Sequence, residues 1–207
     1  MAGKLKIFIA TAVCAVAAVA APAANAGLLV SSAQSCDAQQ FSSPFSRWGD
    51  NATYTPVPGG AFEAGQQGWT LSGGAKIVSG NESFKVRSST DSRSLSIPAG
   101  GVATSPSMCV GLQEPTIRWF QKQASLLGIT GSMTVSVLTE TSLGAVVETP
   151  VGAGLLGTSW SPSLTGVIVT NLLPLLPNNK TAVAFRFRAV TGSWNVDDVY
   201  VDPYQRR

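Results

Sequence analysis

The pattern of hydrophobic and polar positions along the chain predicts a series of short β-strands. Between residues 181 and 189, Phe185 and Phe187 alternate with Arg186 and Arg188. Such alternation places successive side chains on opposite faces of a strand that is buried on one side only. Gly, Pro, Ser and Asn separate these runs, and no segment has the spacing of an amphipathic helix. We expect strands at residues 69–71, 76–78, 83–87, 94–97, 104–110, 116–121, 133–140, 145–151, 167–171, 181–190 and 193–201, with a shorter one near 52–54.

This succession of strands predicts an all-β fold, either a β-sandwich or a jelly roll. The alternation also predicts which residues face outward. If Ile117 and Trp119 point into the core, then Arg118 and Phe120 point away from it. The outward positions expected on this basis are Arg118, Phe120, Thr134, Ser136, Arg186 and Arg188.

The first 26 residues have the organisation of a secretory signal peptide. Lys4 and Lys6 form a basic start, an uncharged and largely apolar run follows over residues 7–21, and Ala24 and Ala26 supply the small residues of a cleavage site. The apolar run is shorter than the roughly 20 residues that a membrane span needs. We therefore expect a secreted, extracellular protein with no membrane insertion after cleavage. A retained membrane anchor is the alternative.

The rest of the chain divides into two parts. Residues 27–58 are small and polar and are expected to form an extended N-terminal arm, while residues 59–204 carry the strand pattern of one jelly-roll domain. Removal of Lys4 and Lys6 with the signal peptide lowers the net charge from +3 to +1. A chain so close to neutrality lacks the basic surface that nucleic-acid binding requires, so we exclude nucleic acid as a partner.

Signal cleavage also leaves two cysteines, Cys36 and Cys109. A pair of cysteines in an exported chain predicts one disulfide bond, with two free thiols as the alternative. The bond would tie the arm to the body of the domain and close a long loop, which the chain-entropy model values at about 4 kcal/mol of stability. Two cysteines without any histidine cannot complete a tetrahedral zinc site.

The chain contains no histidine, and only 12% of its residues are charged. This composition excludes Ser-His-Asp and Cys-His catalysis and removes the usual ligands of zinc, copper and non-haem iron. Glycoside hydrolysis needs two carboxyl groups about 5 to 9 Å apart across a cleft, and no sequence rule selects such a pair among the 11 acidic residues. We therefore expect that the protein is not an enzyme.

Three short motifs resemble one family of binding domains. Residues 59–65 read Gly-Gly-Ala-Phe-Glu-Ala-Gly and precede a Gly-Trp pair, residues 80–86 read Gly-Asn-Glu-Ser-Phe-Lys-Val, and residues 196–199 read Val-Asp-Asp-Val. Together they resemble the start, the second strand and the closing strand of the galactose-binding-like jelly rolls that cellulases and xylanases use as carbohydrate-binding modules. The residues between 88 and 190 match that family only as generic β-structure.

The resemblance also implies roles for individual residues. Phe62 and Trp69 would belong to the core rather than to a ligand site, as large aromatic side chains on strands usually do. The segments around Cys36 and Cys109 fit the carbohydrate-binding modules less well and look more like a group of exported bacterial proteins.

A structural calcium ion is a further implication of the resemblance. It would lie between Glu63 and Asp198, with Asn81 or Glu82 nearby. A hard cation with oxygen ligands would relieve the repulsion between carboxylates at such a junction. The alternative is that Glu63 accepts backbone hydrogen bonds and that Asp197 caps a turn.

Carbohydrate binding is the activity that the resemblance implies. We expect a secreted, non-catalytic binding domain whose partner is a polysaccharide or a cell-surface glycan. Such a site needs an aromatic platform and polar side chains fixed on a sheet. Each candidate also fits a solvated face or, for Trp160, the anchoring of its own loop. The candidate ligand-binding residues are Arg118, Phe120, Arg186, Arg188 and Trp160.

Two other function classes stay open. The apolar run of residues 172–177 would either close one end of the sandwich or form an exposed contact patch. The second case would favour a structural or adhesive cell-surface protein with no small ligand. A glycoside-active enzyme is the less favoured alternative.

Overall fold

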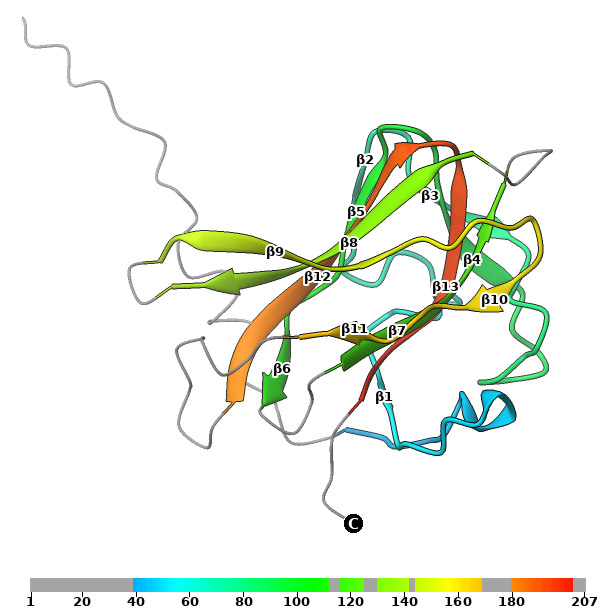
Figure 1. Ribbon diagram of the computed structural model, residues 1–207, viewed down its shortest axis with the longest axis horizontal. Coiled ribbons are helices and arrows are strands. Elements are labelled where there is room, and N and C mark those ends of the chain that lie inside the picture. The colour runs from blue at the N-terminus through cyan, green and yellow to red at the C-terminus, as the bar shows by residue number, and fades with distance from the viewer. Residues whose placement is uncertain (1–38, 112–115, 125–129, 142–143, 169–179, 203–207) are drawn as a thin grey trace, which may run out of the picture.

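The computed structural model describes residues 39–111, 116–124, 130–141, 144–168 and 180–202. These residues form two antiparallel sheets packed face to face, with one short 3-10 helix, η1 (Ser46–Trp48), outside them (Figure 1). The prediction of an all-β sandwich is confirmed. No helix in this part of the chain is long and apolar enough to cross a membrane. The predicted signal peptide, Cys36 and the apolar run 172–177 lie outside the described residues.

The first sheet contains the first and the last strand of the described chain. Its main order is β10-β7-β13-β4-β3, with β1 paired to β13 and β11 paired to β7. The strands of this sheet are β1 (Thr55–Pro56), β3 (Lys76–Ser79), β4 (Arg93–Ile97), β7 (Thr116–Gln123), β10 (Ser161–Pro162), β11 (Gly166–Val167) and β13 (Trp194–Asp202).

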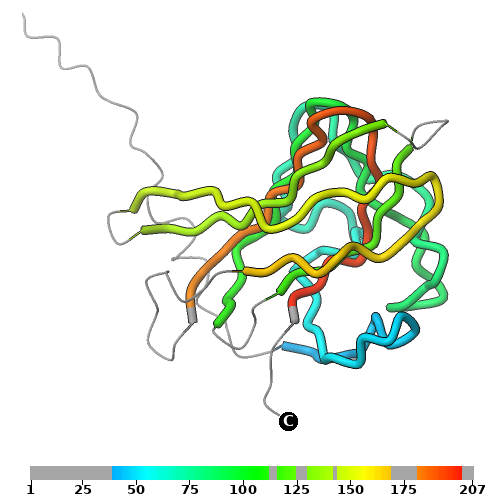
Figure 2. Tube along the Cα trace, viewed as in Figure 1, coloured from blue at the N-terminus to red at the C-terminus, as the bar shows by residue number. Residues whose placement is uncertain are grey.

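The second sheet has the order β2-β5-β12-β8-β9, and β6 pairs with β12 as well. The long strand β12 is central, and the hairpin of β8 and β9 extends beyond the other described strands on one side (Figure 2). The strands are β2 (Thr70–Ser72), β5 (Val102–Thr104), β6 (Met108–Gly111), β8 (Ser132–Glu140), β9 (Val146–Ala153) and β12 (Lys180–Thr191).

The main core lies between the sheets and is built from the positions that the alternation predicts to face inward. Trp119 of β7 meets Phe187 of β12 edge to face, with ring centroids 5.4 Å apart. Phe62 and Trp69 pack in the same core at 5.0 Å, which confirms their expected role. Burial of each such side chain stabilises the fold by roughly 1.5–3 kcal/mol.

The described part of the N-terminal arm packs on the outward face of the first sheet. Phe45 stacks on Phe120 of β7 with ring centroids 5.1 Å apart, and it meets the edges of Tyr54 and Tyr200 at 4.9 and 5.8 Å. These four side chains form a second, smaller core, called the arm core below. Each of them is at most 3% exposed. The described part of the arm therefore forms a layer of the fold on this face of the sheet.

One predicted strand is wrong. Residues 83–87 form a loop, because the carboxylate of Glu82 accepts hydrogen bonds from the backbone amides of Phe84 and Val86. Amides bonded to a nearby side chain cannot also donate to a sheet ladder. Lys85 between them takes a positive φ of 52°, which breaks the extended conformation.

The other strands fall close to their predicted positions, with two differences. The expected strand at 104–110 is divided between β5 and β6, because Pro106 between them has no amide to donate. The expected strand at 52–54 begins slightly later, as β1, and Tyr54 forms an isolated bridge with Ser42 instead. Part of the expected strand at 167–171 lies outside the described residues.

Candidate functional site

The side chains predicted to share one ligand-binding face are divided between the two sheets. Arg118 and Phe120 lie on β7 of the first sheet, and Arg186 and Arg188 lie on β12 of the second. All four point away from the main core, as the alternation predicts. The outward faces of two packed sheets are on opposite sides of a sandwich. The prediction of one common face is therefore wrong.

Arg118 and Phe120 are not exposed, because the N-terminal arm covers them. Phe120 is 0% exposed and Arg118 is 8% exposed. The guanidinium carbon of Arg118 lies 4.1 Å from the centre of the Phe45 ring, and its nitrogens donate to the Asp50 carboxylate and to the Ser163 carbonyl. These contacts fix the arm to β7 and leave neither side chain free for a ligand.

The outward face of the second sheet carries the other two predicted arginines. The strand register places Arg186 between Thr104 of β5 and Ser136 of β8, and it places Arg188 next to Thr134 of β8. The hydroxyl-bearing side chains of β2 continue these rows at the edge of the sheet. We call this surface the polar face; its residues are Thr70, Ser72, Thr104, Thr134, Arg186 and Arg188. Ser136 is only 3% exposed and is not part of the accessible surface.

Arg186 is held in place on the polar face. Its Nη1 lies 2.6 Å from Oε2 of Glu148 on β9, and its Nε donates to the Thr104 hydroxyl at 3.3 Å. Both charged side chains keep about a third of their surface exposed, at 30% for Arg186 and 35% for Glu148. A fixed guanidinium next to hydroxyl groups offers donors and acceptors of defined direction, which suits a ligand that is rich in hydroxyl groups.

A cluster of acidic side chains lies near the predicted calcium site. The register of β13 is irregular between Asp197 and Tyr200, and Asp198 takes a positive φ of 44°. A bulge of this kind re-aims neighbouring side chains, and here two successive carboxyl groups are buried, with Asp197 0% and Asp198 2% exposed. Asp198 interacts electrostatically with three more acids and with Asp197. We call the group Glu63, Glu82, Asp91, Asp197 and Asp198 the acidic cluster.

Backbone amides satisfy part of the acidic cluster. Oε1 of Glu63 accepts hydrogen bonds from the amides of Ser92 and Arg93 at 2.8 and 2.7 Å. Asp197 accepts from the amide of Glu82 at 2.9 Å and from the amide of the residue that follows it. Glu63 thus makes the backbone hydrogen bonds that the alternative to calcium binding predicts.

Asp198 and Asn81 retain oxygen atoms without a hydrogen-bond partner. Both carboxylate oxygens of Asp198 and Oδ1 of Asn81 are buried and accept no hydrogen bond. Arg87 approaches Oδ1 of Asp198 only to 3.9 Å, because its guanidinium forms two hydrogen bonds with Asp91. Buried, unsatisfied oxygen atoms are suitable ligands for Ca²⁺. Among the described residues, however, no group of three or more His, Cys, Asp or Glu side chains could hold a metal.

Burial and mutual repulsion change the ionisation of the cluster. Desolvation, followed by the charge of Asp198, raises the pKa of Asp197 to about 9. Desolvation, followed by the charge of Glu82, raises the pKa of Asp198 to about 7. The motif around residues 80–86 and the Asp-Asp pair indicated this region, whereas no motif indicated Asp91 or Arg87.

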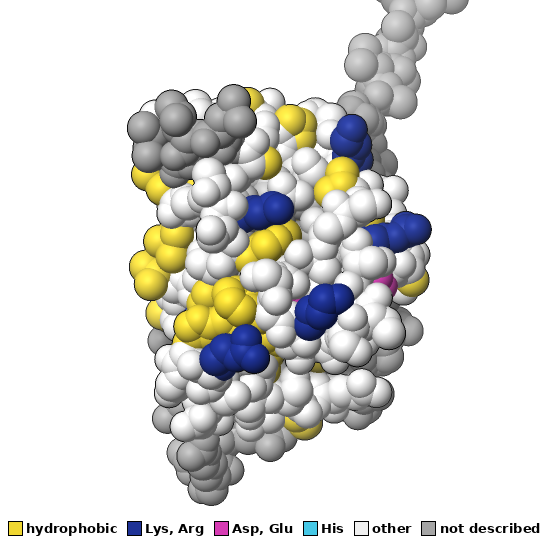
Figure 3. Space-filling model, turned by 90° about the vertical axis from the view of Figure 1, so that its right-hand side faces the viewer, with side chains coloured by type: hydrophobic (Ala, Val, Ile, Leu, Met, Phe, Trp, Pro, Cys, Tyr) yellow, Lys and Arg dark blue, Asp and Glu magenta, His cyan; other side chains and the backbone are white. Residues whose placement is uncertain are grey.

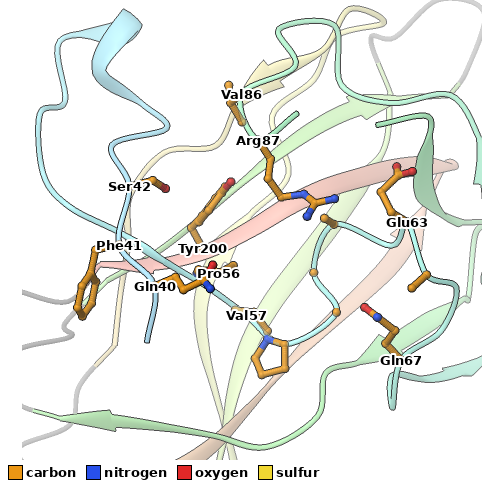
Figure 4. A pocket seen from close by; sticks show the side chains of 15 residues that line it. Gln40, Phe41, Ser42, Pro56, Val57, Glu63, Gln67, Val86, Arg87 and Tyr200 are labelled. Carbon is orange, nitrogen blue, oxygen red and sulfur yellow. The ribbon is translucent and has the colours of Figure 1, made fainter. Parts of the chain in front are cut away.

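A pocket of about 480 Å³ opens beside the acidic cluster (Figure 4). Its walls come from the beginning of the described arm and from the loop that holds Glu63. Figure 4 shows Arg87 between Tyr200 and Glu63 at the edge of this space. The pocket therefore gives one side of the acidic cluster access to solvent.

The remaining predicted residues lie elsewhere. Trp160 is half-buried next to β10, with Nζ of Lys122 5.0 Å from the centre of its ring. Cys109 is buried in β6, and its carbonyl accepts a hydrogen bond of 3.4 Å from the side chain of Gln39. Its predicted disulfide partner, Cys36, lies outside the described residues, so the bond stays a prediction.

Comparison with known proteins finds similarity of structure rather than of sequence. No protein-family model matches the chain, and no curated protein is similar to it in sequence. The similar solved structures include several carbohydrate-binding modules of families 22, 6 and 61.

Three of these structures show the degree of similarity. The xylan-binding CBM22-1 domain of Paenibacillus barcinonensis Xyn10C is 16% identical with a TM-score of 0.45, over 71% of this chain and 93% of that one. The CBM22-1 and GH10 modules of Clostridium thermocellum Xyn10B, complexed with xylohexaose, are 13% identical with a TM-score of 0.48, over 73% and 28%. The module TmCBM61, in complex with β-1,4-galactotriose, is 14% identical with a TM-score of 0.38, over 70% and 95%.

Proposed function

We propose that this chain is a secreted, non-catalytic carbohydrate-binding domain, and that it binds a polysaccharide or cell-surface glycan on the polar face. The observation that carries the proposal is the fixed position of Arg186 between Glu148 and Thr104. Around it, outward hydroxyl groups lie on three neighbouring strands. A sheet holds such groups at a regular spacing of about 4.8 Å between strands, which suits a ligand built from repeating units.

Charge on the polar face favours a ligand with little charge of its own. Glu148 neutralises Arg186, so Arg188 is left as the exposed charge of this surface. No aromatic side chain lies on the outward face of the described strands β2, β5, β8, β9 and β12. Binding would therefore depend on hydrogen bonds to sugar hydroxyl groups, and we expect modest affinity for each site.

A structural calcium ion at the acidic cluster is part of the proposal. Asp198 and Asn81 would hold the ion together with backbone carbonyl groups, since their oxygen atoms are buried without partners. The ion would supply positive charge to a cluster in which Arg87 is the neighbouring cation. Its role would be to fix the loop around Glu82 against β13, and Glu63 would contribute only through Oε2, which accepts one long hydrogen bond of 3.4 Å from the Ser92 hydroxyl.

The disulfide between Cys36 and Cys109 is a further part of the proposal. Gln39 follows Cys36 by three residues and is hydrogen-bonded to the Cys109 carbonyl. Three residues of chain span about 10 Å, a length that is compatible with the proposed bond. The bond would anchor the beginning of the arm, while the arm core anchors its end.

The non-catalytic part of the proposal is supported by how the described acids are used. Glu148 is paired with Arg186, and the acidic cluster is mostly buried and bonded to backbone amides. Release of reducing ends from polysaccharides by the purified protein would contradict this part.

Affinity electrophoresis tests the proposed binding face. The purified protein is run through gels that contain xylan, galactan or another neutral polysaccharide, and we expect at least one of them to retard it. Arg188→Ala and Arg186→Ala should each reduce the retardation about tenfold, because each removes donors from the face. Lys76→Ala removes an exposed charge from β3 of the other sheet and should have no effect. No retardation in any gel would contradict the proposal and favour a structural or adhesive role.

A further inference from the structure

A second surface of the molecule combines aromatic rings with basic side chains. Trp48, Phe84 and Trp160 pack against the arm core and each remains partly exposed. Trp48 meets Phe84 edge to face with ring centroids 4.7 Å apart, and the two rings lie 5.4 and 5.8 Å from that of Phe120 beneath them. The three residues come from η1, from the loop around Glu82 and from the segment before β10. We call them the aromatic patch.

Two cations lie over rings of the aromatic patch. The guanidinium carbon of Arg47 is 5.9 Å from the centre of Phe84, and Nζ of Lys122 is 5.0 Å from the centre of Trp160. Neither cation forms an ion pair within the described part of the chain. A cation–π contact positions a cation without neutralising its charge. Both cations are therefore held on the patch with their charge available to an anion.

The acidic residues of the same segments are already engaged. Asp50, close to η1, binds Arg118 and accepts a hydrogen bond from Tyr54. Glu82, in the loop with Phe84, is 0% exposed and accepts backbone hydrogen bonds. Figure 3 shows the side of the molecule on which η1 and β10 lie in Figure 1, and its coloured side chains are hydrophobic or basic with very little acidic surface visible. This surface is therefore positively charged next to apolar rings.

We propose that the aromatic patch, with Arg47 and Lys122, is a second ligand site that binds a carboxylate-bearing polysaccharide. Sugar rings have apolar C–H faces that pack on aromatic side chains, and the carboxylates of uronic acid units would pair with the two cations. The patch lies on the outward side of the first sheet, opposite the polar face. It adds an acidic-sugar site to the neutral-sugar site proposed above, so one molecule would bridge two sugar chains.

An anionic membrane is the competing ligand for a surface of this composition. Membrane binding requires apolar side chains that protrude and enter the lipid. Trp48, Phe84 and Trp160 are each partly buried against the arm core, so none of them projects in this way. The structure therefore favours the sugar chain.

Binding of polygalacturonate by the purified protein, compared with its fully methyl-esterified form, tests the proposal. The two probes share one sugar ring and differ in charge. We expect polygalacturonate to retard the protein at low salt and the esterified form to bind at least fivefold more weakly. The double variant Arg47→Gln, Lys122→Gln should lose about tenfold in binding to polygalacturonate. The matched control Lys76→Gln, Arg93→Gln removes two exposed charges from β3 and β4 and should lose less than twofold.

The outcomes separate this site from the polar face. Arg188→Ala should lose binding to neutral polysaccharide and retain binding to polygalacturonate through the patch. Equal loss in the Arg47, Lys122 variant and in the control would overturn the patch as a site, because binding would then follow net charge alone. Equal binding of both probes would overturn the pairing with carboxylates. Binding to anionic phospholipid vesicles in place of polygalacturonate would replace the sugar chain with a membrane.

Discussion

At the scale of single residues, burial determines the ionisation of carboxyl groups in the acidic cluster. Asp198 carries two buried oxygens without partners, and its pKa is raised to about 7 by desolvation and by Glu82. At neutral pH, either of two ligands can neutralise this buried carboxylate: a bound proton or a bound cation. Both follow from the same bulge in β13, which buries two adjacent carboxyl groups.

The variant Asp198→Asn distinguishes neutralisation by a proton from neutralisation by a cation. In the presence of a chelator at pH 8, we expect the melting temperature of this variant to equal or exceed that of the wild type, because the amide removes a repelled charge. Added calcium should raise the melting temperature of the wild type but not that of the variant. Glu148→Gln, which removes an acid far from the cluster on β9, should keep the calcium response. A calcium response that survives in Asp198→Asn would place the ion elsewhere.

Phe120→Ala distinguishes a core residue from a ligand contact. The side chain is 0% exposed under the arm, so its truncation should destabilise the protein by about 3–5 kcal/mol in urea unfolding. Phe41→Ala is the matched control, because Phe41 is 44% exposed and its loss should cost less than about 0.5 kcal/mol. Equal stability of the two variants would contradict the arm core.

Sequence pattern predicts the direction of side chains better than their exposure. Alternation correctly places Arg118, Phe120, Arg186 and Arg188 away from the main core. It cannot show that the arm covers the first pair and leaves the second pair open, because the arm has no periodicity of its own. Contacts such as Arg118 with Asp50 join residues that are far apart in the chain, and no local pattern encodes them.

At the scale of elements, the loop around Glu82 is the feature that differs from expectation. Residues 83–87 alternate as a strand would. They nevertheless form a loop, because the carboxylate of Glu82 accepts hydrogen bonds from the backbone amides of Phe84 and Val86. The long, strongly alternating strands β7, β8, β12 and β13 were predictable because burial on one face requires their pattern. The arm has a fixed place because four aromatic rings pack where it meets β7 and β13.

Limited proteolysis tests whether the arm is a layer of the fold. Arg47 is exposed in η1, but trypsin needs several residues of extended chain and therefore cuts only after local opening. Phe45→Ala should remove the contacts with Phe120 and Tyr54 and speed cleavage after Arg47 at least tenfold. Cleavage after Lys76, in β3, provides the internal control and should change little. An unchanged rate after Arg47 would show that Phe45 does not hold the arm.

At the scale of the whole molecule, the acidic cluster makes stability depend on pH. The pKa values of Asp197 and Asp198, about 9 and about 7, lie above the value of roughly 3.9 for an aspartate in an unfolded chain. Between pH 4 and 9 the folded protein therefore binds more protons than the unfolded chain, and its stability falls as pH rises. Desolvation acts to raise the pKa of Asp50, but its hydrogen bonds to Tyr54 and Arg118 outweigh this effect and lower the pKa. The stability that ionised Asp50 contributes is therefore lost as the pH falls into the acidic range.

Melting temperature against pH checks this account. With a chelator, we expect the maximum between about pH 4 and 6 and a steady decrease towards pH 9. With calcium, the decrease should flatten, because the ion takes the place of the bound protons. A melting temperature that rises from pH 5 to 9 in chelator would contradict the buried, repelled carboxyl groups.

The central claim is that a sugar chain binds to the polar face, and amide chemical-shift mapping tests it most directly. An oligosaccharide of the neutral polysaccharide that retards the protein is titrated into ¹⁵N-labelled protein. We predict saturable shifts on β5, β8 and β12, centred on Thr104, Thr134, Arg186 and Arg188. Shifts confined to other strands, or no saturable shift at all, would contradict the proposal that this face of the sandwich binds carbohydrate.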